Sequence, residues 1–239
     1  MFGPAKAIIF DMDGTLLDSM PSALRGLKEA VEVGLGHAIG DEELHKTLGM
    51  APADIIRTWI PSEPVAYDRA LAYWNKFHAA LTSQDYIPFF GIPELLTYLK
   101  GKDIPFALLT GRDRFGTLGF LNELGWMDTF FTEERIIAGD ELHVRPKPSP
   151  EGVVHLAKVM GVEPKDVLMV GDGRADMLAG SAAGAMTAGV LWDFPPGPEP
   201  RRLKFKRLWE RFDGLPCDMR LENPGALIAW LEGTTHINT

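Results

Sequence analysis

The chain has 239 residues, 46% of them hydrophobic and 24% charged, which is the usual composition of a globular protein. Its formal net charge of −9 argues against a nucleic-acid partner, because binding a phosphate backbone normally requires a basic face. No stretch reaches the roughly 18 uncharged apolar residues that a membrane-spanning helix needs, and the single cysteine, Cys217, fits a reducing compartment. We therefore expect a cytoplasmic protein with neither a nucleic-acid nor a membrane partner.

Short apolar runs recur along the chain, separated by longer segments with helical periodicity. Runs that are apolar without alternation are typical of strands buried on both faces of a parallel sheet. Because these runs alternate with helical segments, they predict an α/β fold with a doubly wound, Rossmann-like parallel sheet. The predicted strands are 7–10, 106–109, 167–170, 188–192 and a weaker one at 219–221.

A long helical insertion separates the first two predicted strands. The gap is about ninety residues, far more than a crossover connection needs. A Gly-Ile-Pro turn at 91–93 then begins a core helix that runs to about Lys100. We therefore predict a small all-helical domain at 17–88 and a core formed by 1–16 and 89–239. Helical spacing within the insertion covers 21–33, 42–48, 53–59 and 65–81.

The segment 194–214 differs in composition from the rest of the chain. It opens with four prolines and continues with basic residues, which predicts a loop followed by a short basic helix. We interpret it as a solvated surface insertion, and the alternative is a lid or dimer contact that brings positive charge near an anionic substrate. The basic residues are Arg201, Arg202, Lys204, Lys206, Arg207 and Arg211.

Two aspartates directly follow the first predicted strand, in Asp11-Met12-Asp13-Gly14-Thr15. Carboxylates two residues apart would point the same way in a continuing strand, and the glycine lets the chain turn sharply after them. By itself this pattern also fits a turn or a calcium-like acidic loop. Its position at a strand end favours a site, because ligands of parallel sheets gather at the carboxyl ends of the strands.

A second acidic pair, Asp172 and Asp176, follows the predicted strand 167–170. These carboxylates would face the first pair if the two strands are neighbours in the sheet. An aspartate at a strand end is also a common helix N-cap, and either residue could have only that role. The pair therefore gains meaning only together with the first motif.

Two weaker signals complete the set. Lys147 lies between two prolines that hold its backbone extended, shortly before a predicted helix near Ser149. Thr110-Gly111 ends the strand 106–109 and offers a hydroxyl and a backbone N–H to phosphate oxygens, although such a dipeptide is often purely structural.

Together, these segments closely resemble the haloacid dehalogenase superfamily of phosphohydrolases, in their order and in their position at strand ends. The resemblance is to the group of phosphoglycolate phosphatases and β-phosphoglucomutases, and it implies that 17–88 is an α-helical cap that excludes water and selects the substrate. The matching segments are DMDGTLLDS at 11–19, LLTG at 108–111, RPKPSP at 145–150 and GDGRADML at 171–178.

The resemblance implies a Mg²⁺-dependent phosphatase acting on a small phosphorylated metabolite. Asp11 would attack the phosphorus and form an aspartyl-phosphate, and Asp13 would protonate the leaving oxygen and later deprotonate the hydrolytic water. Mg²⁺ would be bound by Asp11, by the backbone carbonyl of Asp13 and by Asp172. Lys147 would shield the charge of Asp11, and Asp176 would hold Lys147 or a metal-bound water.

Substrate contacts are implied for Thr110, Gly111 and the cap residue Ser19. The hydroxyl of Thr110 and the backbone N–H of Gly111 would hold phosphoryl oxygens. Relatives often have Asn or Ser at the position of Gly111, so a side-chain contact is lost here while the N–H contact remains. Arg112 or Arg114 could compensate, but we expect both to be surface residues.

Other functions of this fold fit the residues less well. A dehalogenase needs no acid for its leaving group and hence no Asp13, and a phosphonoacetaldehyde hydrolase lacks that aspartate and needs a cap lysine. A receiver-type signalling domain would have neither Asp13 nor the insertion, and a non-catalytic phosphate-binding protein would not need the ionisable set. A sugar phosphomutase of the β-phosphoglucomutase type keeps every core residue and remains the alternative. The substrate and the oligomeric state, monomer or homodimer, stay open.

Overall fold

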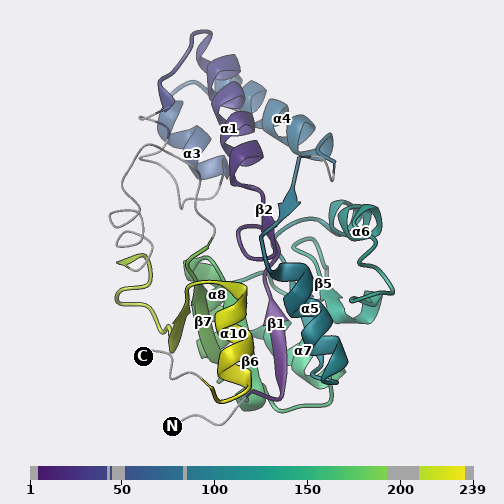
Figure 1. Ribbon diagram of the computed structural model, residues 1–239. Helices are drawn as coiled ribbons and strands as arrows, with labels where there is room; N and C mark the ends of the chain where they lie inside the picture. The colour runs from purple at the N-terminus through teal and green to yellow at the C-terminus, as the bar shows by residue number, and fades with distance from the viewer. Residues whose placement is uncertain (1–4, 42–43, 45–51, 83–84, 193–209, 235–239) are drawn as a thin grey trace. The chain divides into compact units, whose positions relative to one another are not determined.

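The chain forms two compact units, Met1–Asp18 with Ile87–Thr239 and Ser19–Tyr86 (Figure 1). Among the described residues, no helix combines the length and the hydropathy needed to cross a bilayer. The computed structural model describes residues 5–41, 44, 52–82, 85–192 and 210–234.

The first unit is built on a six-stranded sheet with the order β5-β4-β1-β6-β7-β8, in which all neighbouring strands run parallel. Strands β1, β4, β6 and β7 are buried along their whole length, as expected when helices cover both faces of a sheet. The predicted α/β fold is thereby confirmed. The strands are β1 Ala7–Phe10, β4 Phe106–Leu109, β5 Ile136–Ile137, β6 Val167–Gly171, β7 Met186–Val190 and β8 Met219–Leu221.

The strand predicted at 188–192 is wrong in its bounds, because β7 begins two residues earlier at Met186 and ends at Val190. The polar Thr187 concealed this start in the sequence. Thr187 is nevertheless fully buried, and its hydroxyl donates to the carbonyl oxygen of Pro216 at 2.6 Å, which satisfies it inside the core. Strand β5 was not predicted, since two isoleucines are too short a run to identify from periodicity.

Helices cover both faces of the sheet (Figure 1). Helices α7 and α8 contact each other on one face, where their apolar side chains join Ile9, Leu109 and Met169 in one buried core. Helices α5 and α10 contact each other on the other face. The helices are α5 Ile92–Gly101, α6 Arg114–Glu123, α7 Glu151–Val159, α8 Arg174–Ala182 and α10 Pro224–Leu231, with short 3-10 turns η1 Glu133–Arg135 and η2 Pro164–Asp166.

The second unit is helical, with α1 Met20–Leu35, α3 Pro52–Trp59 and α4 Pro64–Ala79. Its own apolar core includes Val31 from α1, Ile56 from α3 and Ala70 from α4. Most of the helix predicted at 42–48 lies outside the described residues.

The first unit also contains two short strands, β2 Leu17–Asp18 and β3 Ile87–Pro88, which pair antiparallel.

Asp85 ties the last described turn of the helical unit to α1. Its carboxylate accepts the backbone N–H of Thr82 at 3.1 Å and a guanidinium N–H of Arg25 at 3.0 Å, and its carbonyl oxygen accepts the hydroxyl of Ser22 at 2.9 Å. The backbone N–H of Thr82, with further help from its hydroxyl and from Arg25, lowers the pKa of Asp85 below its usual value. The turn is therefore stabilised by the ionised carboxylate.

We expect Asp85→Ala to lower the free energy of unfolding by about 1 kcal/mol at pH 7. Because the pKa of Asp85 is lower in the folded state, this contribution is present above the unfolded-state pKa of about 3.9 and is lost as the pH falls through the folded-state value. Urea unfolding at pH 7 and pH 3 measures it, and the loss should shrink at pH 3. Substitution of the exposed Asp68 on α4 by alanine is the control, and an equal loss in both variants at pH 7 would contradict the assignment.

Candidate active site

The predicted site residues follow three neighbouring strands. Strand β1 pairs with β4 on one side and with β6 on the other, all parallel, so that their carboxyl ends meet at one edge of the sheet. Asp11 follows β1, Thr110 follows β4, and Asp172 follows the last residue of β6. The strands that precede the two acidic pairs, β1 and β6, are thus neighbours in the sheet, as the sequence analysis required.

A buried lysine joins two of these carboxylates. The ammonium group of Lys147 lies 2.6 Å from Oδ1 of Asp11 and 2.6 Å from Oδ1 of Asp176. All three side chains are less than a tenth exposed, at 8%, 9% and 4% respectively. Burial alone would lower the pKa of Lys147, but the two carboxylates raise it above its usual value, so the lysine is a permanent cation.

The candidate nucleophile, Asp11, has more negative charge around it than Lys147 can neutralise. Burial, reinforced by the charges of Asp176 and Asp13, raises the pKa of Asp11 to about 7 against the opposing effect of Lys147. Two buried carboxylates share a single ammonium, which leaves a negative charge without compensation in a low-dielectric place. Such a site favours a further cation.

The donor set near Asp11 fits a divalent cation. Carboxylate oxygens of Asp11, Asp172 and Asp176 all lie within 4.8 Å of one another, and hard cations such as Mg²⁺ prefer oxygen ligands of this kind. Gly14 permits this approach: it has φ of 76°, and a Cβ there would lie 2.6 Å from Oδ2 of Asp172. The cluster can therefore hold a metal ion, and the contribution of the Asp13 carbonyl stays a prediction.

Asp13 is bound by Arg112, which we expected to lie at the surface. Nη2 of Arg112 donates to Oδ1 of Asp13 at 2.7 Å, and Nε donates to Oδ2 at 3.2 Å. The Arg112 side chain is only 2% exposed, so the expectation of a surface residue was wrong. Arg114 is 34% exposed and pairs with Glu133 and Glu141. The sequence feature that could have indicated its burial is that Arg112 directly follows the Thr-Gly pair at a strand end.

The predicted phosphate-binding loop begins at the end of β4. Thr110 is buried, its backbone N–H donates to the carbonyl oxygen of Ile137 at 3.0 Å, and its hydroxyl accepts the backbone N–H of Arg112 at 3.1 Å. Gly111 next to it is exposed. The contacts of Thr110 and Gly111 with a phosphoryl group stay predictions.

Ser19 belongs to the helical unit, where it is the N-cap residue of α1 and is buried. Its predicted contact with substrate stays a prediction.

Of the basic segment 194–214, only the last residues are described. One of them, Arg211, donates from Nη1 to the backbone carbonyl of Asp172 at 2.7 Å, and its guanidinium lies 3.6 Å from the Asp172 carboxylate.

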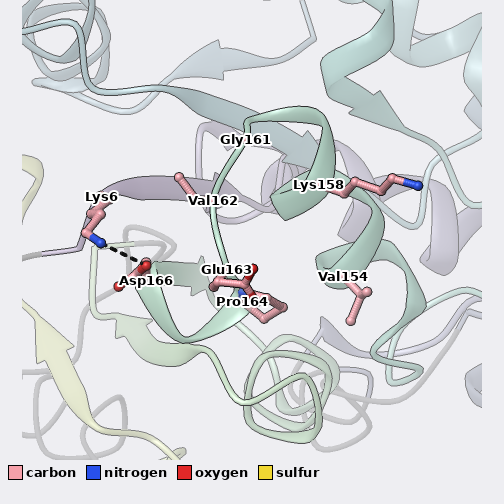
Figure 2. A pocket seen from close by; sticks show the side chains of 8 residues that line it. All are labelled: Lys6, Val154, Lys158, Gly161, Val162, Glu163, Pro164 and Asp166. Atoms are coloured by element: carbon pink, nitrogen blue, oxygen red, sulfur yellow. Dashed lines mark hydrogen bonds and ion pairs between the residues drawn. The ribbon is translucent and has the colours of Figure 1, made fainter.

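A separate pocket of about 510 Å³ lies at the amino ends of the strands, opposite the predicted site (Figure 2). Lys6 precedes β1 and Asp166 precedes β6, and these two residues form an ion pair at 3.0 Å within the pocket. None of the predicted site residues lines it. The lining residues are Lys6, Val154, Lys158, Gly161, Val162, Glu163, Pro164 and Asp166.

Comparison with known proteins gives one consistent family. The model of the haloacid dehalogenase-like hydrolases matches residues 5–184. A phosphoglycolate phosphatase of Thiobacillus denitrificans is 31% identical over 201 residues, covering 81% of this chain and 86% of that protein. A putative pyrophosphatase PpaX of Clostridium perfringens is 28% identical over 196 residues, covering 80% and 86%. The crystal structure of a HAD hydrolase from Entamoeba histolytica has the same fold, with a TM-score of 0.74 at 20% identity over 95% of this chain and 99% of that one.

We expect Lys147→Met to lower the free energy of unfolding by about 3–5 kcal/mol at pH 8, because two buried carboxylates lose their shared cation. The loss should be smaller at pH 5, where protonation of Asp11 relieves the repulsion. Urea unfolding at both pH values measures the effect. Lys158→Met, a change at an exposed lysine, serves as the control, and a pH-independent loss in the Lys147 variant would contradict the shared ion pair.

Proposed function

The chain belongs to the haloacid dehalogenase-like hydrolases, and on that basis we propose that it is a Mg²⁺-dependent phosphatase that forms an aspartyl-phosphate on Asp11. The observation that carries this proposal is the buried cluster in which one ammonium binds both Asp11 and Asp176 at 2.6 Å. A carboxylate can attack an anionic phosphoryl group only where positive charge offsets the repulsion. Lys147 supplies part of that charge permanently.

The metal would supply the rest. When bound by Asp11, Asp172 and the Asp13 carbonyl, Mg²⁺ would neutralise charge on the phosphoryl oxygens and fix their orientation. The grouping of carboxylates from Asp11, Asp172 and Asp176 supports this assignment, and so does the negative charge that Lys147 leaves uncompensated.

Two displacements at phosphorus complete the reaction. In the first, a carboxylate oxygen of Asp11 forms a bond to phosphorus while the ester P–O bond breaks, and the leaving oxygen keeps the electron pair and takes a proton from Asp13. In the second, Asp13 takes a proton from water, the water oxygen bonds to phosphorus, and the Asp11–phosphorus bond breaks to restore the carboxylate. Asp13 thus ends in the protonation state in which it began.

Thr110 is suited to hold the phosphoryl group during both displacements. Its hydroxyl oxygen already accepts the backbone N–H of Arg112, so its proton can be donated to a phosphoryl oxygen. The exposed backbone N–H of Gly111 would add a second donor. Positioning of this kind supplies much of the catalysis in phosphoryl transfer.

The proposed substrate is a small phosphorylated metabolite in the cytoplasm, and the protein is proposed to act as a monomer or homodimer. Because a relative at 31% identity is named phosphoglycolate phosphatase, 2-phosphoglycolate is the first substrate to test. Pyrophosphate follows, after the putative pyrophosphatase at 28% identity. Glucose 1-phosphate belongs in the panel as well, since isomerisation rather than phosphate release would indicate a phosphomutase.

We expect Asp11→Asn to reduce phosphate release at least about 10⁴-fold with every substrate, because the attacking carboxylate is gone. Release of inorganic phosphate in the presence of Mg²⁺ is the measurement. Asp166→Asn, at the opposite edge of the sheet, is the control and should retain activity. Full activity in the Asp11 variant would show that Asp11 is not the nucleophile.

Removal of divalent cations with EDTA should abolish phosphate release, and added Mg²⁺ should restore it. Binding can be followed without turnover, because a ligand of the folded state raises the thermal unfolding temperature. We expect Mg²⁺ to raise that temperature for the unaltered chain and to have little effect on Asp172→Asn. An equal rise in both proteins would place the metal elsewhere.

A further inference from the structure

The carboxylates of Asp11 and Asp13 bind different cations, and these two cations come from different loops. Lys147 binds Asp11 at 2.6 Å, and Arg112 binds Asp13 at 2.7 Å and 3.2 Å. The Arg112 contact is bidentate, since Nε and Nη2 each bind a different oxygen. A guanidinium fork of this kind fixes the plane of a carboxylate as well as its position.

The loop that carries Arg112 is held on both sides of the residue. The backbone N–H of Arg112 donates to the hydroxyl of Thr110 at 3.1 Å, and its carbonyl oxygen accepts the backbone N–H of Gly139 at 2.7 Å. Gly139 lies against the chain here, and a Cβ on it would overlap the carbonyl oxygen of Gly111. Asp113 then caps α6 by accepting the backbone N–H of Gly116 at 2.8 Å. The start of the arginine side chain is therefore fixed by backbone contacts.

The arginine side chain is also held along its length. It is 2% exposed, and its guanidinium carbon lies 4.7 Å from the centre of the Phe120 ring, at the distance of a cation–π contact. Asp13 is 34% exposed and so remains accessible from outside the protein. A buried, rigid cation thus holds a carboxylate that faces solvent, which is the arrangement needed to orient a group that exchanges protons with substrate and water.

We propose that Arg112 is the positioning residue for Asp13, which it holds in the orientation that serves proton transfer in both displacements. The inference rests on the proposed function, because it assigns a role to Arg112 through the acid and base of that reaction. Arg112 acts through Asp13 rather than on the phosphoryl group. Loss of the fork should therefore resemble loss of Asp13 itself, in a weaker form.

The two displacements provide a way to separate this role from a structural one. With p-nitrophenyl phosphate, the leaving nitrophenolate is a stable anion and departs without a proton, so the first displacement bypasses Asp13. The second displacement still needs Asp13 to take a proton from water. A misplaced Asp13 should therefore slow hydrolysis of the aspartyl-phosphate more than its formation.

The experiment compares Arg112→Met, Arg112→Lys and Arg114→Met by stopped-flow with p-nitrophenyl phosphate and Mg²⁺. We expect Arg112→Met to lower kcat about 10²-fold and KM with it, so that kcat/KM stays nearly unchanged, and to release one equivalent of nitrophenolate per site in a burst. Arg112→Lys keeps the charge but not the fork, so it should show a smaller loss. Arg114→Met alters the neighbouring arginine, which binds Glu133 and Glu141, and should have unaltered kinetics.

A second comparison uses an alkyl phosphate, 2-phosphoglycolate, whose leaving alkoxide needs a proton. Both displacements then depend on Asp13, so Arg112→Met should lose more activity than with p-nitrophenyl phosphate and should show no burst. In the Asp13→Asn background, a further Arg112→Met change should cost less than about threefold, since coupled residues are not additive.

Several results would overturn the proposal. A rise in KM at constant kcat would mean that Arg112 binds the substrate directly, and full additivity with Asp13→Asn would show that it acts elsewhere. If Arg112→Met does not fold, Arg112→Lys carries the test, and a lysine variant with unaltered kcat and no burst rejects the role of the fork. A wild-type protein that releases phosphate from no substrate would instead refute the proposed function.

Discussion

The ion pair between one buried ammonium and two carboxylates organises the carboxyl edge of this sheet. Lys147 binds Asp11 and Asp176 at 2.6 Å each, and the three side chains are almost fully removed from water. Buried charges are tolerated only when they are paired and hydrogen-bonded, so the strand end at Asp11, the lysine loop and the start of α8 must meet. The same shortage of positive charge that makes this arrangement demanding also makes it suited to binding a metal ion.

The two aspartates that follow β1 also differ in the cation that each one binds. Asp11 and Asp13 are two residues apart, but their partners Lys147 and Arg112 belong to different loops. Two equivalent carboxylates could not take the proposed roles of nucleophile and proton carrier, because those roles need different surroundings. The partners make the surroundings different: Asp11 is buried with an ammonium, while Asp13 is partly exposed on a guanidinium fork.

Much of this arrangement could be predicted from local sequence features. Apolar runs identified β1, β4 and β6, and the polar residues after them identified Asp11, Thr110 and Asp172, because strand burial and turn chemistry are local properties. The start of β7 was missed since the hydroxyl of Thr187 is satisfied by Pro216, a contact 29 residues away in sequence. The burial of Arg112 was missed for a similar reason, because its ion-pair partner Asp13 lies 99 residues earlier in the sequence.

The long sequence separation of these contacts has a consequence for how the protein becomes active. Lys147 follows Asp11 by 136 residues in the chain, and Asp176 follows Lys147 by a further 29 residues. A nascent chain therefore has no assembled charge cluster until the whole segment from Asp11 to Asp176 has left the ribosome. Because contacts of such separation form late and slowly, activity should appear only when β1, β6 and the loop that carries Lys147 have come together. Recovery of turnover during refolding would thus report the last long-range step.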